Sequence, residues 1–250
     1  MPFSLHQLAS VFQIRDQNGL PYILIGGQAV NYWAERFVEV ERDLVQFRPF
    51  TSLDIDFLGC RDDVFRIARQ LGVKGARASH PLELTALSGI IPLRIEDNEI
   101  EVEIVRKVPG LPEANLQASA IHARWKDWEI RVLDPISLLH AKAKLALLVP
   151  QKERRDVDHI KILVYCVRAF LREALQAVEQ DAALARGWLG AAEKTLALTE
   201  STTGARLARR HAVNWAGILP LKEIHRSPAP KVIQFREKRL PLWERKVHRK

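Results

Sequence analysis

Apolar and polar positions change their pattern once along the 250-residue chain. Up to about residue 133, short apolar or alternating segments lie between helical ones, and from residue 134 the apolar spacing is helical. A first helix is expected over residues 4–17, with Ser4 as N-cap and Asn18-Gly19 as the stop. The pattern therefore predicts an α+β half followed by a helical half.

Strand patterns occupy four segments of the first half. Residues 22–25 are apolar throughout, residues 53–58 alternate strictly, and residues 129–133 form one more strand. Residues 91–105 are expected to form a hairpin that turns near Asp97-Asn98. The helices expected in the same half cover residues 28–37 and 61–71.

The order of these elements sets the expected architecture. It is an α+β fold with a small mixed β-sheet core that is flanked by helices and followed by a C-terminal helical region. We place the α+β core at residues 1–133, a helical domain at residues 134–225 and a basic tail at residues 226–250.

The composition is typical of a globular protein, with 47% apolar and 27% charged residues. No apolar run approaches the roughly 18–20 residues that a membrane span needs. The first residues lack the basic start and apolar core of a secretory signal. Cys60 and Cys166 show no CxxC spacing and are expected as buried free thiols, with a lone disulfide as the alternative. We expect a cytoplasmic protein with no membrane partner.

Positive charge is concentrated at the end of the chain. The net charge is +8, and residues 226–250 hold nine Lys and Arg against two acidic residues, a net +7. Such a tail either meets nucleic-acid phosphates or is a solvated packing segment. Its candidates for nucleic-acid contact are Arg236, Lys238, Arg239 and Trp243. Three upstream arginines either line a basic groove or face solvent: Arg206, Arg209 and Arg210.

Paired carboxylates are the first candidate chemistry. Asp54 and Asp56 stand at positions i and i+2 of a strand and point to the same side, and Glu101 and Glu103 repeat the pattern. If the two strands share a sheet, three or four carboxylates converge, a donor set that suits Mg²⁺. The alternative is two solvent-facing strand edges with ordinary polar alternation.

A glycine pair is the second candidate. Gly26-Gly27 separates the strand at residues 22–25 from a helix, a position where backbone N–H groups can meet phosphate. Tight packing explains such a pair as well. The motifs GxxxxGK[ST], GxGxxG, HExxH, GxSxG and paired CxxC are absent, which disfavours P-loop, Rossmann, zincin, hydrolase and zinc-site interpretations.

Together, Ile25-Gly26-Gly27, Asp54-Ile55-Asp56 and a later strand carboxylate resemble the signature of the DNA polymerase β nucleotidyltransferase superfamily. The resemblance implies that Gly26 and Gly27 grip a triphosphate and that both aspartates bind two Mg²⁺ or Mn²⁺ ions. It also implies a third metal ligand that helps deprotonate the acceptor, Glu103 in preference to Glu101. Two features depart from the family pattern: 26 residues separate Gly27 from Asp54, and the third carboxylate is glutamate.

The segment DPISLLHAKAKLAL, followed by RRDVDHIKIL, resembles AbiEii-like minimal nucleotidyltransferases. The resemblance implies a lysine that reaches the nucleotide phosphates, which is either Lys142 or Lys144. Arg155 and Asp156 then form a structural ion pair or contact substrate. The likeness covers about residues 20–160.

These resemblances imply an enzyme that moves NMP from an NTP to a hydroxyl on RNA or tRNA, protein or a small molecule. RNA would bind through the basic tail, and an antitoxin protein is a further expected partner. The alternative is a catalytically impaired member of the fold that binds nucleic acid or protein. A small-molecule transferase of the aminoglycoside type is a third interpretation.

Overall fold

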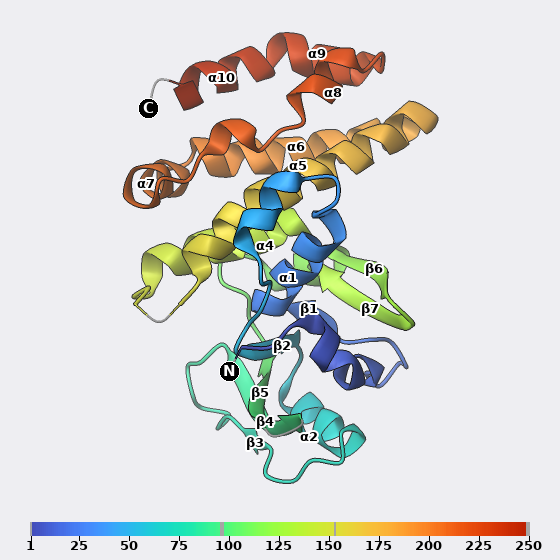
Figure 1. Cartoon of the computed structure of the whole chain (residues 1–250), viewed down its shortest axis with the longest axis vertical. Coiled ribbons are helices and arrows are strands. Elements are labelled where there is room, and N and C mark those ends of the chain that lie inside the picture. The colour runs from blue at the N-terminus through green and yellow to red at the C-terminus, as the bar shows by residue number, and fades with distance from the viewer. Residues whose placement is uncertain (1, 96–97, 153, 249–250) are drawn as a thin grey trace. The chain divides into compact units, whose positions relative to one another are not determined.

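The computed structural model describes residues 2–95, 98–152 and 154–248 (Figure 1). The chain forms two compact units. Unit 1 contains residues 1–35 and 48–141, and unit 2 contains residues 36–47 and 142–250. The domain boundaries expected after residues 133 and 225 stay a prediction.

Unit 1 is built on a mixed sheet in the order β3-β4-β5-β2-β1-β7-β6. The pairs β1–β7 and β2–β5 are parallel, and the other neighbours are antiparallel. The described strands are β1 (Ile23–Ile25), β2 (Asp54–Leu58), β3 (Arg77–Ala78), β4 (Leu87–Ile95), β5 (Asn98–Val105), β6 (Ala120–Trp125) and β7 (Trp128–Leu133). The helical segments of this unit are η1 (Leu5–Gln13), α1 (Gly26–Phe37), α2 (Arg61–Gln70), α3 (Glu113–Ala118) and α4 (Pro135–Leu148), the ends of α1 and α4 extending into unit 2.

The apolar side of β2 and β5 forms part of the core of unit 1. Ile55 and Ile104 are fully buried there, and α2 packs against β3, β4 and β5 (Figure 1). Gly89 permits this close approach, because a Cβ at that position would lie 2.8 Å from Val64 Cγ2. Alternation along the two strands then places their acidic side chains on the opposite side of the sheet.

Unit 2 is helical and is organised around the 25-residue helix α5. Glu41 is buried against it, with Arg172 Nη2 2.8 Å from Glu41 Oε1 and Arg168 Nε 3.0 Å from Glu41 Oε2. The described elements are η2 (Arg42–Phe47), α5 (Asp156–Gln180), η3 (Ala182–Leu184), α6 (Ala185–Glu200), α7 (Thr202–His211), η4 (Trp215–Gly217), α8 (Leu221–Arg226), α9 (Pro230–Lys238) and α10 (Leu240–His248).

The structure confirms the α+β class, with a small mixed sheet, flanking helices and a C-terminal helical region. The helix expected over residues 4–17 is the shorter 3-10 helix η1, and the strands β3 and β6 and the helix α3 are additions to the prediction. The hairpin of β4 and β5 is confirmed, while Asp97 of its expected turn lies outside the described residues.

Most of the segment 226–250 is folded: α9 and α10 extend to His248 and bury Phe235 and Trp243. The expectation for the cysteines is corrected in part. Cys60 and Cys166 are both free, as expected, but Cys60 is exposed because it stands at the N-cap of α2. Within the described ranges, we find no helix with both the length and the apolar character of a membrane span.

The junction of α6 and α7 provides a test of packing in unit 2. A Cβ on Gly204 would lie 2.3 Å from the carbonyl oxygen of Leu198, whereas a Cβ on Gly190 meets nothing within 4 Å. Gly204→Ala should lower the free energy of unfolding by about 1–3 kcal/mol, because backbone must move. Gly190→Ala, in the middle of α6, should raise it by about 0.5–1 kcal/mol. Urea denaturation measures both, and equal effects would contradict the packing.

Candidate functional site

The pairing of β2 with β5 brings acidic side chains together. In this parallel pair Asp54 is opposite Glu101 and Asp56 is opposite Glu103, and neighbouring strands lie about 4.8 Å apart. One carboxylate oxygen each of Asp54, Asp56 and Glu103 lies within 4.8 Å of the other two. The convergence predicted for strands that share a sheet is therefore confirmed, and the three side chains are half-buried.

The geometry also separates the two glutamates. Among the described residues Glu101 lies outside the three-carboxylate group, and its side chain is exposed. Glu103 is level with Asp56, which pairs with Ile25 at the end of β1. The third acidic group therefore lies where the chain leaves β1 for α1.

Gly26 closes the site from the side of β1. Its φ is +67°, and a Cβ built on it would lie 1.7 Å from Asp56 Oδ2 and 2.5 Å from Asp56 Cγ. Glycine is required twice, by the left-handed backbone and by the absence of space for a side chain. Because Gly26 begins α1 and Gly27 is buried in its first turn, the start of this helix lies directly beside the carboxylates.

Ser52 is a site residue that the sequence interpretation missed. Its hydroxyl donates a hydrogen bond of 2.9 Å to Asp54 Oδ1. Its backbone exchanges two hydrogen bonds with Phe3, of 2.7 Å and 3.0 Å, which hold the segment before β2 in place. The Ser-x-Asp spacing was the available signal, but so common a spacing does not by itself indicate a hydrogen bond.

The face that carries the carboxylates continues onto β4. Pro92 is opposite Glu101 and Arg94 is opposite Glu99, so these side chains share one side of the sheet. Glu101 and Arg94 are exposed and Pro92 is half-buried. This side of β4 and β5 is therefore accessible to solvent.

The three carboxylates fit a hard divalent cation. They offer oxygen donors, which Mg²⁺ and Mn²⁺ prefer, and they are exposed enough for an ion to keep water ligands. With no side chain on Gly26, the carboxylate of Asp56 lies directly against the backbone at the helix start. The residues present thus suit a metal ion.

Lys142, the first lysine candidate, is engaged inside unit 2. Its ammonium lies 2.9 Å from Asp156 Oδ1, and Arg154 Nε lies 2.6 Å from Asp156 Oδ2. Burial alone would raise the pKa of the Asp156 carboxyl, but the charges and hydrogen bonds of Lys142 and Arg154 hold it below its usual value. Asp156 therefore has a structural role in unit 2.

Lys144 has the opposite environment. It is exposed on α4 and has no hydrogen bond or ion pair within the part of the chain that the structure describes. Arg155 is exposed as well, and its Nε lies 3.9 Å from Asp158 Oδ2. Of the two lysines, Lys144 is thus the one whose ammonium is available to a ligand.

His159 lies beside the Lys142–Asp156 pair. It is 5% exposed, and both of its ring nitrogens lack a partner among the described residues. Burial, with the nearby charge of Lys142, lowers the pKa of the imidazole to about 3. His159 is therefore neutral in the folded protein at neutral pH.

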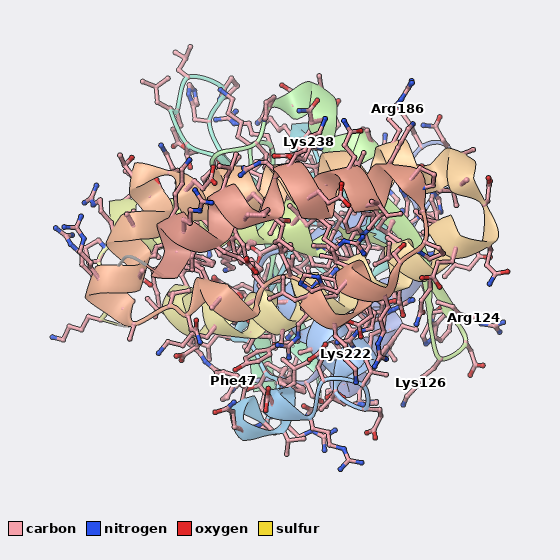
Figure 2. All side chains as sticks on the ribbon, turned by 90° about the horizontal axis from the view of Figure 1, so that it is seen from above. Phe47, Arg124, Lys126, Arg186, Lys222 and Lys238 are labelled. Carbon is pink, nitrogen blue, oxygen red and sulfur yellow. The ribbon has the colours of Figure 1, made fainter. Side chains whose placement is uncertain are left out.

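The predicted nucleic-acid contacts at the end of the chain are mostly occupied. Trp243 is 1% exposed and donates from Nε1 to Thr199 Oγ1 at 2.8 Å, so its ring is packed inside unit 2 and is not available at the surface. Arg239 forms two hydrogen bonds to Glu200, and Arg236 donates to the carbonyl of His225. Lys238 is exposed at the surface (Figure 2) and is without a partner in the described ranges.

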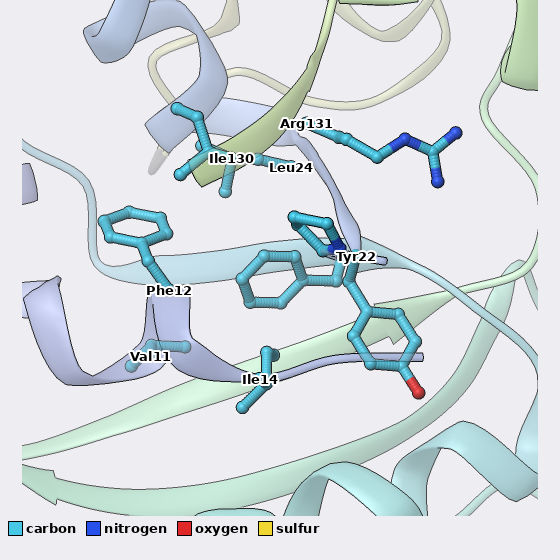
Figure 3. A pocket seen from close by; sticks show the side chains of 9 residues that line it. Val11, Phe12, Ile14, Tyr22, Leu24, Ile130 and Arg131 are labelled. Atoms are coloured by element: carbon cyan, nitrogen blue, oxygen red, sulfur yellow. The ribbon is translucent and has the colours of Figure 1, made fainter. Parts of the chain in front are cut away.

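A small apolar cavity in unit 1 offers no second site. Figure 3 shows Phe12, Ile14, Tyr22 and Ile130 around it, with Arg131 at its edge. Its volume is about 10 Å³, which is at the lower limit for one water molecule. It is a packing defect of the core.

Comparisons with known proteins find a likeness in structure. No protein-family model matches the chain, and no curated protein matches it. Among solved structures, it is similar to an antigenic nucleotidyltransferase-like protein from Paracoccidioides brasiliensis, at 13% sequence identity and a TM-score of 0.44. The likeness covers 67% of this chain and 78% of that one.

The contact between Gly26 and Asp56 can be tested against a matched glycine. Gly19 has a similar φ of +75°, but a Cβ on it meets nothing within 4 Å. Gly19→Ala should therefore cost only the left-handed backbone term, about 1–2 kcal/mol. Gly26→Ala should cost about 1–3 kcal/mol more, because the Asp56 carboxylate must move. Urea denaturation of both variants measures the difference, and equal losses would refute the contact.

The burial of His159 predicts a pH dependence. The unfolded chain binds a proton at His159 near the usual pKa of 6.5, and the folded chain only near pH 3. As pH falls below 6.5, the free energy of unfolding should therefore decrease, by up to about 1.4 kcal/mol per pH unit from this residue. His159→Gln should remove that part of the slope between pH 6 and pH 4. Parallel curves for the two proteins would contradict the neutral buried imidazole.

Proposed function

We propose that this chain is a metal-dependent nucleotidyltransferase that moves a nucleoside monophosphate from an NTP to a hydroxyl group. In the reaction a bond forms between the acceptor oxygen and the α-phosphorus, the bond from that phosphorus to the pyrophosphate oxygen breaks, and pyrophosphate leaves. The observation that carries the proposal is the group of Asp54, Asp56 and Glu103, whose oxygens lie within 4.8 Å of one another beside the start of α1.

The acidic residues have separate tasks in this proposal. Asp54 and Asp56 would hold the metal ions, with Ser52 fixing the Asp54 carboxylate through its hydroxyl. Glu103 would complete the ligand set and accept the proton of the attacking hydroxyl. Bound Mg²⁺ or Mn²⁺ would supply charge neutralisation on the phosphates and acidify the acceptor hydroxyl.

The triphosphate would be held by the start of α1. The first N–H groups of a helix have no partner within the helix, and its dipole favours negative charge there. The backbone at Gly26 lies against the Asp56 carboxylate with no side chain between them. A phosphate at the helix start would therefore lie next to the metal ligands. A contribution from Lys142 or Lys144 stays a prediction, and the exposed Lys144 is the better placed of the two to bind an anion.

An RNA acceptor, tRNA included, is favoured by the distribution of charge. Unit 2 holds 25 Lys and Arg against 14 Asp and Glu, a net +11, whereas unit 1 holds 13 against 16, a net −3. A polyanion is the substrate class that such a helical unit attracts. Placement in the AbiEii-like group, and an antitoxin protein as partner, stay predictions from the sequence resemblance.

One observation favours the alternative function, a member of the fold that binds without efficient transfer. Lys142, one of the two expected phosphate ligands, is held in a buried ion pair with Asp156. If Lys142 were the essential lysine, transfer would be impaired. The intact carboxylate group favours the enzyme.

Calorimetry with a non-hydrolysable NTP analogue tests the site. Micromolar binding is expected in Mg²⁺ and none in EDTA. Asp54→Asn and Asp56→Asn should weaken binding by about 100-fold or more, because ligands of the metal are lost. Glu101→Gln is the matched control: it removes a carboxylate from the same face of the neighbouring strand β5, opposite Asp54 and outside the three-residue group, and should bind like the wild type.

Binding that is equal with and without metal, or that Glu101→Gln weakens as much as Asp56→Asn does, would refute the proposed site. Transfer is then tested with an α-labelled NTP and total RNA. Label on RNA with the wild type, and none with Asp54→Asn, is the result expected of the enzyme.

A further inference from the structure

Three arginines share the exposed face of α7. Arg206, Arg209 and Arg210 stand at positions i, i+3 and i+4, which are neighbours on a helix surface. All three side chains are exposed, and together they line a hollow of about 310 Å³. We call this set the arginine face.

The arginine face is not neutralised by the protein. None of its three guanidinium groups has a hydrogen bond or an ion pair within the chain as the structure describes it. The nearest helix, α6, carries Glu193 and Glu200, but Arg239 binds both of these carboxylates. Like charges at such spacing repel and destabilise a helix slightly. An anionic ligand would remove this repulsion between the three arginines.

The helix dipole explains only part of the pattern. Basic side chains in the last turn of a helix are favourable, which accounts for Arg209 and Arg210 near the end of α7 at His211. Arg206 stands in the middle of the helix, outside the last turn, and gains little from the dipole. Its presence on the same face is the feature that points to a ligand.

The opposite face of α7 is firmly packed. Leu207 is fully buried, Ser201 accepts a hydrogen bond from the Gly204 amide at 3.0 Å, and Trp215 Nε1 donates to the Gly204 carbonyl at 2.9 Å. The arginines therefore project from a fixed helix, so a ligand would not have to order the backbone that presents them.

We propose that the arginine face of α7 binds the phosphate backbone of the RNA acceptor. The identity of the acceptor rests on the proposed function, but the surface does not depend on the chemistry at Asp54. Guanidinium groups bind phosphate oxygens through paired N–H donors, which suits three closely spaced forks to a chain of phosphates. A membrane surface is disfavoured, because the apolar Leu207 points into unit 2 and the exposed positions Thr202, Arg206, Arg209 and Arg210 are polar.

Fluorescence anisotropy with a labelled single-stranded 20-nucleotide RNA tests the proposal. Arg206→Ala/Arg209→Ala/Arg210→Ala should weaken binding by at least tenfold at moderate salt. It should also reduce the slope of log K against log salt by about 2, the value expected when three phosphate contacts are lost at about 0.7 each. The lysine triple variant at the same positions keeps the charge but not the paired donors, and should bind with intermediate affinity.

The control variant removes the same charge elsewhere in unit 2: Arg186→Ala/Lys222→Ala/Lys231→Ala. These side chains are exposed and have no partner among residues that the structure describes; Arg186 and Lys222 are labelled in Figure 2. Binding close to wild type is expected. Equal weakening by the two alanine triples would show that only net charge matters, and would overturn the proposal.

Three other outcomes also decide. If Lys238→Ala weakens RNA binding and the arginine variant does not, α9 and not α7 is the contact. If the wild type binds anionic vesicles or polyglutamate as tightly as RNA, and the arginine variant binds neither, the surface is not an RNA site.

NTP binding should be unchanged in the arginine variant. If neither the wild type nor the arginine variant binds NTP while RNA binding still depends on the arginines, the transferase proposal fails and RNA binding by the arginine face stands.

Discussion

The register between β2 and β5 is the constraint on which the rest of the candidate site depends. Side chains alternate along each strand, so a slip of one residue would turn every acidic group into the core and every apolar one to solvent. The register is fixed by the burial of Ile55 on β2 and Ile104 on β5 in the core of unit 1. The same apolar packing that stabilises unit 1 therefore sets Asp56 level with Glu103, and the geometry of the carboxylates is a consequence of the core.

Without a bound cation, the cluster of three carboxylates destabilises the fold. Three acidic side chains within 4.8 Å of one another repel, and Gly26 has a left-handed backbone conformation with no contact from a side chain of its own. Strain and like charge of this kind persist when the surroundings enforce them. Here the surroundings are the buried strand β1 and its pairing with Asp56. Such an arrangement is better explained by a ligand than by stability.

Sequence periodicity predicted the parts of the site that depend on neighbours along one strand. Spacing of i and i+2 put Asp54 beside Asp56, and alternation gave the face of Glu103. The contact of Gly26 with Asp56 needed the topology, since β1 and β2 are joined through 28 intervening residues. The burial of Lys142 depended on Asp156, and that of Trp243 on Thr199, both beyond any local pattern. The helices α9 and α10 were not predicted, because prolines and charged residues interrupt their apolar pattern; both helices pack against α6.

Charge divides between the two units in a way that matches a division of labour. Chemistry at phosphorus needs a cluster of acids to hold cations, and such a cluster by itself repels a polyanionic acceptor. Affinity for that acceptor must therefore come from other residues. Because the electrostatic part of RNA binding comes from contacts along the phosphate backbone, these residues need not lie near the reacting atoms. Unit 1 has a net charge of −3 and contains the carboxylates, while unit 2 has a net charge of +11 and presents the exposed arginine face on α7. In the function proposed above, separating the two signs would let each residue set serve its own ligand: cations in unit 1 and phosphates in unit 2.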